Sequence, residues 1–305
     1  MKNPIKISVI ICSYNREDYI INAIESLFYQ TQPYTDYEVI VVDNNSLDNT
    51  AQLCKDYISV HAGYHIVYIT ETQQGASFAR NTGAAVARGE LLAFMDDDAI
   101  ADNDFIERIL RFFRQYPNAT GLGGRIIPKY IPEEPRWMSH YVASLVGNFQ
   151  YSDKLEIFKA GKYPLESNMV VHKKDFDLVG GFNTALPGVK GTLRIGGEGK
   201  DFFLKLQARG AVIYYDPLLR VQHVVEVKKL TREYLYRIAS GIGRGERVRT
   251  KSISNSAYVK KIIEYLYKLG GSIVLGLLYT FRGHPSKAWP VIHFRIDALK
   301  GLFNR

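Results

Sequence analysis

Four short apolar segments recur through the first hundred residues, and a stretch of helical pattern separates each from the next. They are runs of strand length, rich in Val, Ile and Leu and bounded by turn residues, as buried strands are. The runs lie at residues 7–12, 38–42, 66–69 and 91–95. Strands and helices that alternate at this spacing predict an α/β fold with a mostly parallel sheet flanked by helices.

Helix signals follow each of these strands. Asn15 stands where it can cap the first helix, which has Ile20, Ile24 and Leu27 on one face. We expect further helices at 48–59, 76–88, 104–116, 173–179 and 201–208, and late strands at 212–215 and 219–221. Three prolines mark residues 128–137 as a loop, because proline has no N–H to give to a sheet.

The fourth apolar run leads directly into three consecutive carboxylates, Asp96, Asp97 and Asp98. They stand where a strand leaves the core, at the edge where open α/β sheets bind ligands. Adjacent carboxylates repel one another unless a cation or a donor network offsets the repulsion. Mg²⁺ suits this place, because it takes one or two carboxylates together with phosphate oxygens. The alternative is an acidic helix start, since residues 102–104 open a helical pattern.

Polar turns follow the first two strands at the same edge of the sheet. The first turn consists of Ser13, Tyr14, Asn15 and Arg16. The second begins with Asp43, which can accept a hydrogen bond from a base or a ribose hydroxyl, whereas Asn45 and its neighbours are also ordinary turn residues. No Gly-rich phosphate loop follows a strand, so metal and basic residues such as Arg80 would neutralise the phosphates.

A second group of candidates lies near residue 200. Gly197 and Glu198 stand in a run of glycines, which lets the backbone approach a ligand closely. Glu198 and Asp201 are candidates for a general base that deprotonates a hydroxyl, and Asp201 is equally suited to cap the predicted helix. His223 is a candidate metal ligand or phosphate contact, although a lone histidine at a strand edge is more often structural.

Five motifs in order resemble family 2 glycosyltransferases, which have the GT-A fold, and the resemblance covers residues 5–225. The motifs are Ser-Val-Ile-Ile-Cys-Ser-Tyr-Asn-Arg, Glu-Val-Ile-Val-Val-Asp-Asn-Asn-Ser-x-Asp-x-Thr, Gly-x-x-x-Ala-Arg-Asn-x-Gly, Ala-Arg-Gly-Glu-Leu-Leu-Ala-Phe-Met-Asp-Asp-Asp, and Val-Gly-Gly-Phe-Asn ahead of Gly-Gly-Glu. The resemblance implies a UDP-, GDP- or dTDP-linked sugar donor, Mg²⁺ or Mn²⁺, and inversion at the anomeric carbon.

The resemblance also assigns roles to individual residues. Asp96 and Asp98 fall on the family's D-x-D positions, which contact the ribose and the metal that bridges the diphosphate. Asp43 falls on the position that holds the base or ribose. Asn168 and residues 180–182 fall on the acceptor side.

One position departs from the family pattern. The family commonly has Glu-Asp-x-Asp where this chain has Glu198, Gly199, Lys200 and Asp201. Glycine cannot act as a base, so the resemblance leaves Glu198 as the expected base and Asp201 as the next candidate.

Charge is divided unevenly along the chain. Residues 1–219 carry 22 basic and 26 acidic side chains, whereas residues 220–305 carry 17 and 5. Around residues 258–269, apolar and basic residues alternate with helical spacing, which suits an anionic membrane surface. The alternative is a helix packed on the catalytic domain or on a second subunit. No nucleic-acid-binding motif accompanies the charge, so we expect no nucleic-acid partner.

These observations predict a catalytic domain at 1–230 and a basic helical segment at 231–305. Residues 1–100 would bind the nucleotide sugar and residues 101–230 the acceptor. The chain opens without a secretory signal, and its late apolar run, 273–281, is too short to span a bilayer. We therefore expect a cytoplasmic location, with peripheral contact at the inner face of the plasma membrane.

The predicted activity is sugar transfer from a nucleotide sugar to a hydroxyl of a glycan or lipid-linked acceptor in cell-surface polysaccharide synthesis. Two alternatives use a similar sheet. One is a sugar-phosphate nucleotidyltransferase, which usually needs a Gly-rich basic loop after the first strand. The other is a nucleotide-sugar-binding module with weak turnover, which Gly199 makes conceivable.

Overall fold

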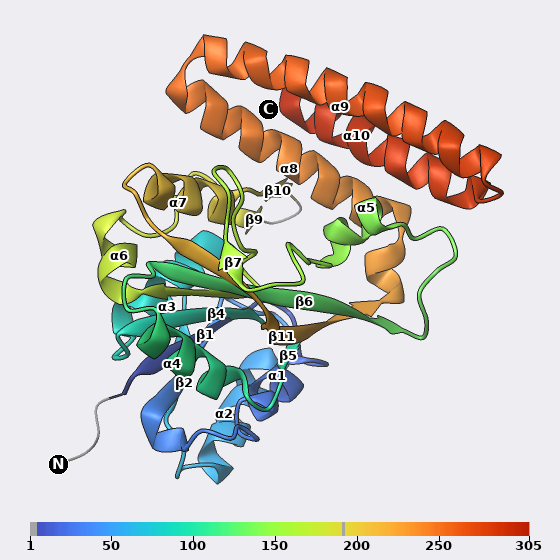
Figure 1. Cartoon of the computed structure of the whole chain (residues 1–305). Coiled ribbons are helices and arrows are strands. Elements are labelled where there is room, and N and C mark those ends of the chain that lie inside the picture. Colours follow the sequence, from blue (N-terminus) through green and yellow to red (C-terminus); the bar gives the residue numbers. More distant parts are fainter. Residues whose placement is uncertain (1–4, 191–192, 305) are drawn as a thin grey trace. The chain divides into compact units, whose positions relative to one another are not determined.

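A computed structural model describes residues 5–190 and 193–304 of the chain (Figure 1). The chain divides into two compact units, each built from three segments of the sequence. The first unit comprises Met1–Ile127, Phe149–Asn183 and Gly199–His223, and the second comprises Pro128–Asn148, Thr184–Glu198 and Val224–Arg305. We call the second the helical unit, since its last segment holds three long helices.

A nine-stranded sheet forms the centre of the fold, and the four strands predicted from the first hundred residues are confirmed. They are β1 (Ile7–Ser13), β2 (Tyr37–Asp43), β3 (Ile66–Thr70) and β4 (Leu91–Asp96). These four are parallel neighbours in the order β3-β2-β1-β4, and the sheet continues through β8 (Asn168–His172), which is antiparallel to β4. Parallel pairing aligns the ends of β1, β2 and β4, so the polar turns that follow them share one sheet edge.

The sheet is completed by strands from later in the chain. These are β5 (Ala99–Ala101), β6 (Gly121–Ile131), β7 (Glu156–Ile157) and β11 (Ile213–Glu226), while β9 (Gly188–Lys190) and β10 (Leu193–Ile195) form a separate pair. β11 is one strand where two were predicted, and β6 extends to Ile131 in the segment predicted as loop.

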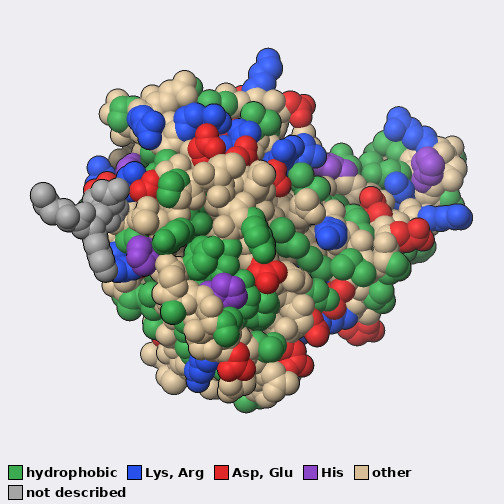
Figure 2. Space-filling view, turned by 90° about the horizontal axis from the view of Figure 1, so that it is seen from below, with side chains coloured by type: hydrophobic (Ala, Val, Ile, Leu, Met, Phe, Trp, Pro, Cys, Tyr) green, Lys and Arg blue, Asp and Glu red, His purple; other side chains and the backbone are tan. Residues whose placement is uncertain are grey.

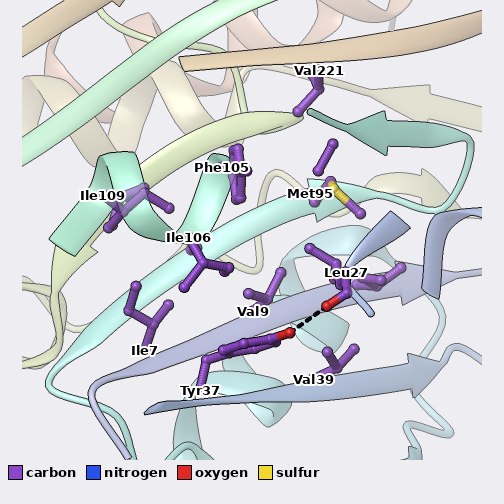
Figure 3. Packing of buried hydrophobic residues seen from close by; sticks show 14 of the residues in the cluster. Ile7, Val9, Leu27, Tyr37, Val39, Met95, Phe105, Ile106, Ile109 and Val221 are labelled. Carbon is purple, nitrogen blue, oxygen red and sulfur yellow. Dashed lines mark hydrogen bonds between the residues drawn. The ribbon is translucent and has the colours of Figure 1, made fainter. Parts of the chain in front are cut away.

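Helices cover both faces of the sheet. On one face the core contains residues of α1 (Ile20–Ser26), α2 (Thr50–Val60) and α4 (Phe105–Gln115). On the other it contains residues of α3 (Ala76–Val86), α6 (Lys173–Leu178) and α7 (Glu198–Gln207). Alternate residues of β1 point to opposite faces, because side chains alternate along a strand. Ile7 and Val9 thus pack with the α4 residues in Figure 3, where the Tyr37 hydroxyl also donates to the Leu27 carbonyl at 2.5 Å.

Two predicted helix caps are wrong. α1 begins at Ile20, and Asn15 instead has a left-handed backbone with φ 53°. The amide oxygen of Asn15 accepts from the N–H of Leu47, so this side chain joins two loops. α7 begins at Glu198, which places Asp201 inside the first turn, where its Oδ2 lies 2.8 Å from Lys205 Nζ.

The helical unit is built around α8 (Arg232–Ile253), α9 (Asn255–Phe281) and α10 (Ala288–Phe303), with the short α5 (His140–Ala143). α8 and α10 cross closely through glycines, because a Cβ on Gly301 would lie 1.9 Å from the Ser240 carbonyl oxygen. Two arginines of α8 also make contacts inside the helical unit. Arg247 donates to the Phe303 carbonyl, and Arg249 pairs with buried Glu246 at 2.6 Å.

α9 packs along one face and is exposed along another. Its inner face packs within the unit, where Tyr265 is buried with Ala298 and Leu302 of α10. A second stripe along the helix is exposed, with side chains 45–86% accessible, and we call it the α9 outer face. It consists of Val259, Ile263, Leu266, Tyr267, Ile273, Val274, Leu277, Leu278 and Phe281.

The apolar run at 273–281 is the end of this 27-residue helix. By length and composition alone, α9 could cross a membrane. Residues 273–281 alone are too short to span a bilayer, but the 27-residue helix that contains them is not.

Figure 2 shows one face of the molecule, on which acidic and basic side chains are interspersed among hydrophobic ones. The surplus of positive charge is therefore not gathered on that face.

Candidate functional site

The turns after β1 and β2 are tied together by hydrogen bonds. The N–H of Asn15 donates to Ser46 Oγ at 2.9 Å, and the N–H of Arg16 donates to Thr50 Oγ1 at 2.8 Å. Ser13 is buried at the end of β1, and Tyr14 is half-buried in the turn. These bonds fix Arg16 at the carboxyl end of the sheet.

Asp43 is buried at the end of β2, and both of its carboxylate oxygens accept hydrogen bonds. Oδ1 accepts from the N–H of Ser46 at 3.1 Å, and Oδ2 accepts from the hydroxyl of Tyr68 at 2.9 Å. Asn45 lies in the same turn with a left-handed backbone, φ 64°. The structure thus gives Asp43 a turn-stabilising role, and its partner Tyr68 was not identified from the sequence.

Asp96, Asp98 and His223 come together at the end of β4, and one ligand atom from each lies within 4.8 Å of the others. His223 Nε2 lies 3.0 Å from Asp98 Oδ1 and 3.8 Å from Asp96 Oδ2. The register explains the meeting, because His223 of β11 pairs with Ala99 of β5, the residue after Asp98. Asp98 and His223 are buried, and Asp96 is partly exposed.

Asp97, between the two, faces a different partner. Its Oδ1 accepts from Arg16 Nε at 3.2 Å, and Arg16 Nη2 also lies 3.6 Å from Asp98 Oδ2. Burial raises the pKa of Asp97 to about 7, and the charges of Asp98 and Asp96 add to this against the opposing effect of Arg16. Three consecutive carboxylates meet here, and a bound cation would offset the repulsion between them.

Arg80 of α3 also lies near Asp96. Its Nη2 is 3.8 Å from Asp96 Oδ1, and its guanidinium lies 5.4 Å from the centre of the Phe182 ring. Its side chain is buried, with 10% exposed. Arg16 and Arg80 therefore border the cluster and could contact an anion bound there.

Two predicted acceptor-side motifs have structural partners. Asn168 is fully buried, and its Nδ2 donates to the carbonyls of Arg125 and Leu219, which ties β8 to β6 and β11. Asn81 donates to the Phe182 carbonyl and accepts from the Phe182 N–H, both at 2.9 Å. The Gly-Gly-Phe and Ala-Arg-Asn motifs are thus partners in one contact.

The beginning of α7 holds the predicted base candidates. Gly197, with φ 97°, precedes the helix, and Glu198 is its first residue and is buried. Asp201 faces Lys205 one turn later. The N–H of Gly199 donates to Oε1 of Glu166 at 2.7 Å. Glu166 was not identified from the sequence, since no pattern there links it to residue 199.

The sequence of this chain is similar to those of known glycosyltransferases. The sequence model described as Glycosyl transferase family 2 matches residues 8–180. A glucosyl-dolichyl phosphate glucuronosyltransferase of Haloferax volcanii is 25% identical over 223 residues, 72% of this chain and 69% of that protein. A poly(ribitol-phosphate) beta-glucosyltransferase of Bacillus spizizenii is 30% identical over 135 residues, which is 42% of this chain and 21% of that protein.

Solved structures share the fold. A mannosyltransferase of Pyrobaculum calidifontis in complex with GDP-Man and Mn²⁺ superposes with a TM-score of 0.67 at 17% identity, covering 98% of this chain and 89% of that one. TarS 1–349 of S. aureus in complex with UDP gives a TM-score of 0.53 at 17% identity, covering 96% and 90%. The predicted GT-A fold is confirmed by these superpositions.

Proposed function

Because the chain belongs to glycosyl transferase family 2 and is a glycosyltransferase, we propose that it transfers a sugar, with inversion, from a nucleotide sugar to a hydroxyl of a glycan or lipid-linked acceptor. The meeting of Asp96, Asp98 and His223 at the sheet edge carries this proposal. The relatives favour transfer to an acceptor over the sugar-phosphate nucleotidyltransferase alternative. A cytoplasmic location, with donor binding by residues 1–100 and acceptor binding by 101–230, belongs to the same proposal.

Asp96, Asp98 and His223 fit a divalent metal ion. Two carboxylates and one imidazole supply three ligand atoms and leave room for diphosphate oxygens in a six-coordinate ion. The imidazole nitrogen favours Mn²⁺ over Mg²⁺, which prefers oxygen ligands alone. The bound ion would polarise the diphosphate and offset the negative charge of the departing nucleotide.

The residues around the cluster would hold the donor. Arg80 and Arg16 border the carboxylates and would contact diphosphate oxygens, with the rest of the first turn close by. Asp43 would meet the base or ribose, and the hydrogen bonds from Ser46 and Tyr68 hold its carboxylate in place for that contact. A carboxylate has several lone pairs, so these bonds leave it able to accept another.

Inverting transfer needs a carboxylate that takes the acceptor's hydroxyl proton as the new glycosidic bond forms. Glu198 and Asp201 are the candidates that the sequence provides. Lys205 Nζ lies 2.8 Å from Asp201 Oδ2, so an ion pair already engages the Asp201 carboxylate.

The test is a binding and turnover panel with UDP-, GDP- and dTDP-sugars, with Mn²⁺, with Mg²⁺ and with EDTA. We expect one nucleotide class to bind and to be hydrolysed slowly in a metal-dependent way. Binding without turnover under all conditions would instead support the nucleotide-sugar-binding module.

The α9 outer face supports a peripheral contact with an anionic membrane. Nine large apolar side chains share this stripe, and the surrounding segment carries a large excess of Lys and Arg. A helix with this distribution binds in the interface of a bilayer, where basic residues add about 1 kcal/mol each. A lipid-linked acceptor would be reached from such a position.

Replacing Leu277 and Phe281 together with glutamate should reduce binding to anionic vesicles by at least about tenfold, because each buried apolar side chain contributes roughly 1.5–3 kcal/mol. Both side chains are more than half exposed, so folding should be unaffected. Flotation with phosphatidylserine vesicles measures the effect. Leu178 and Val60, exposed on the first unit, provide a matched control when both are changed to glutamate. Equal flotation of all three proteins would exclude the α9 contact.

A further inference from the structure

Glu166 places a carboxylate at the beginning of α7, against residue 199. Its Oε1 accepts from the Gly199 N–H at 2.7 Å. A Cβ on Gly199 would lie 2.2 Å from that oxygen and 2.5 Å from the carboxyl carbon. Any other residue at 199 would therefore displace Glu166, and the absence of a side chain at 199 is what admits the carboxylate.

The register of the sheet puts Glu166 at the edge that carries the acidic cluster. Asn168 of β8 pairs with Met95 of β4 in antiparallel register. Asn168 is the first residue of β8, and Glu166 stands two residues before it, in the turn that enters β8 beside the end of β4. Glu166 thus lies on the side of the proposed donor site while being fixed from α7.

The anchor holds the Glu166 carboxylate in a fixed position. The N–H of Gly199 belongs to the first turn of a ten-residue helix, whose N-terminus favours a negative charge. A carboxylate can accept from several donors, so a bond to one N–H is compatible with a second bond to an acceptor hydroxyl. Glu166 is half-buried, which leaves it in reach of a ligand and restricts its motion.

We infer that Glu166 is the general base of the transfer, in place of Glu198 and Asp201. The inference rests on the proposed function. As the acceptor oxygen attacks the anomeric carbon, its O–H bond breaks and the proton passes to the Glu166 carboxylate. The bond from that carbon to the diphosphate breaks, and its electron pair leaves with the nucleoside diphosphate. Gly199 acts as a positioning residue that fixes Glu166 through its N–H.

The experiment compares Glu166→Gln, Glu198→Gln and the exposed control Glu156→Gln, with the nucleotide sugar selected by the panel above and water as acceptor. Glutamine keeps an oxygen that can accept from the Gly199 N–H but cannot take a proton. Glu166→Gln should lower kcat by roughly 10²–10⁴-fold, since a general base contributes about that much. Nucleotide affinity with Mn²⁺ should stay nearly unchanged for all three variants, and Glu198→Gln should lose less than about tenfold.

A rescue makes the test independent of a single variant. In a Glu166→Ala background, Gly199→Asp supplies a carboxylate from α7 to the place that the Glu166 carboxyl group occupied. This double variant should have a kcat at least about tenfold higher than that of Glu166→Ala. If Glu166→Gln does not fold, Gly199→Ala should lower kcat alone, by pushing Glu166 aside. The inference is wrong if Glu166→Gln turns over like the parent, if Glu198→Gln alone shows the large loss, or if Gly199→Ala is silent. Lack of parent turnover with every donor would instead count against the proposed function.

Discussion

Replacing Asp98 with asparagine should lower metal-dependent turnover by roughly 10³-fold, because a bound ion supplies several kcal/mol of charge stabilisation in the transition state. Asp98 is buried, and its Oδ1 lies 3.0 Å from His223 Nε2, closer than Asp96 at 3.8 Å. Asparagine preserves the shape and one oxygen but removes the charge that holds the cation. The expected loss is in both Mn²⁺ affinity and nucleotide affinity, measured by calorimetry with Mn²⁺ and with EDTA.

Asp102 offers a matched control for this substitution. It lies four residues further on and pairs with Arg220 at 2.8 Å, and that pair is partly exposed. Asp102→Asn should keep the nucleotide affinity of the parent. Nucleotide binding by Asp98→Asn that equals the parent's with Mn²⁺ would show that the ion is held elsewhere.

Replacing His223 with alanine is the second large change, with an expected loss of about 10²-fold in Mn²⁺ affinity, since removing a metal's supporting groups typically costs 10–100-fold. The imidazole is the only nitrogen in the three-ligand group, so its loss should also reduce the preference for Mn²⁺ over Mg²⁺. Competition between the two ions, followed by nucleotide binding, measures this preference. His140→Ala, at an exposed histidine of α5, provides the control.

An unchanged Mn²⁺ preference in His223→Ala would mean that His223 only supports Asp98 by hydrogen bonding. If His223→Ala does not fold, a structural role of His223 is indicated. The variant His223→Gln then separates hydrogen bonding to Asp98 from ligation of Mn²⁺. Glutamine can hydrogen-bond to Asp98 but is a weak ligand for Mn²⁺.

Local sequence pattern was sufficient for the first half of the fold. The runs that became β1, β2, β3 and β4 are continuous, apolar and bounded by turns, and their bounds were predicted within one or two residues. The acidic end of β4 followed from the same pattern. Side chains at the carboxyl ends of parallel strands lie at one edge of the sheet, independently of the lengths of the loops between the strands. The edge proposed to bind the nucleotide sugar could therefore be predicted from the sequence.

Contacts between distant segments could not be predicted in this way. Asn15 looks like a helix cap, but a left-handed turn directs it to the loop at Leu47 instead. The pairing of His223 with Ala99 depends on the register of an antiparallel strand more than a hundred residues away. Glu166 and Gly199 likewise come into contact only when the turn before β8 packs against α7. Neither segment alone contains a pattern that predicts this contact.

The measurement that most directly tests the metal-dependent donor site is anomalous diffraction from crystals grown with Mn²⁺ and the nucleotide that the binding panel selects. We predict one manganese peak between Asp98 and His223, in contact with the diphosphate and near Asp96. A nucleotide bound without manganese at this edge, or manganese bound away from these three residues, would contradict the account.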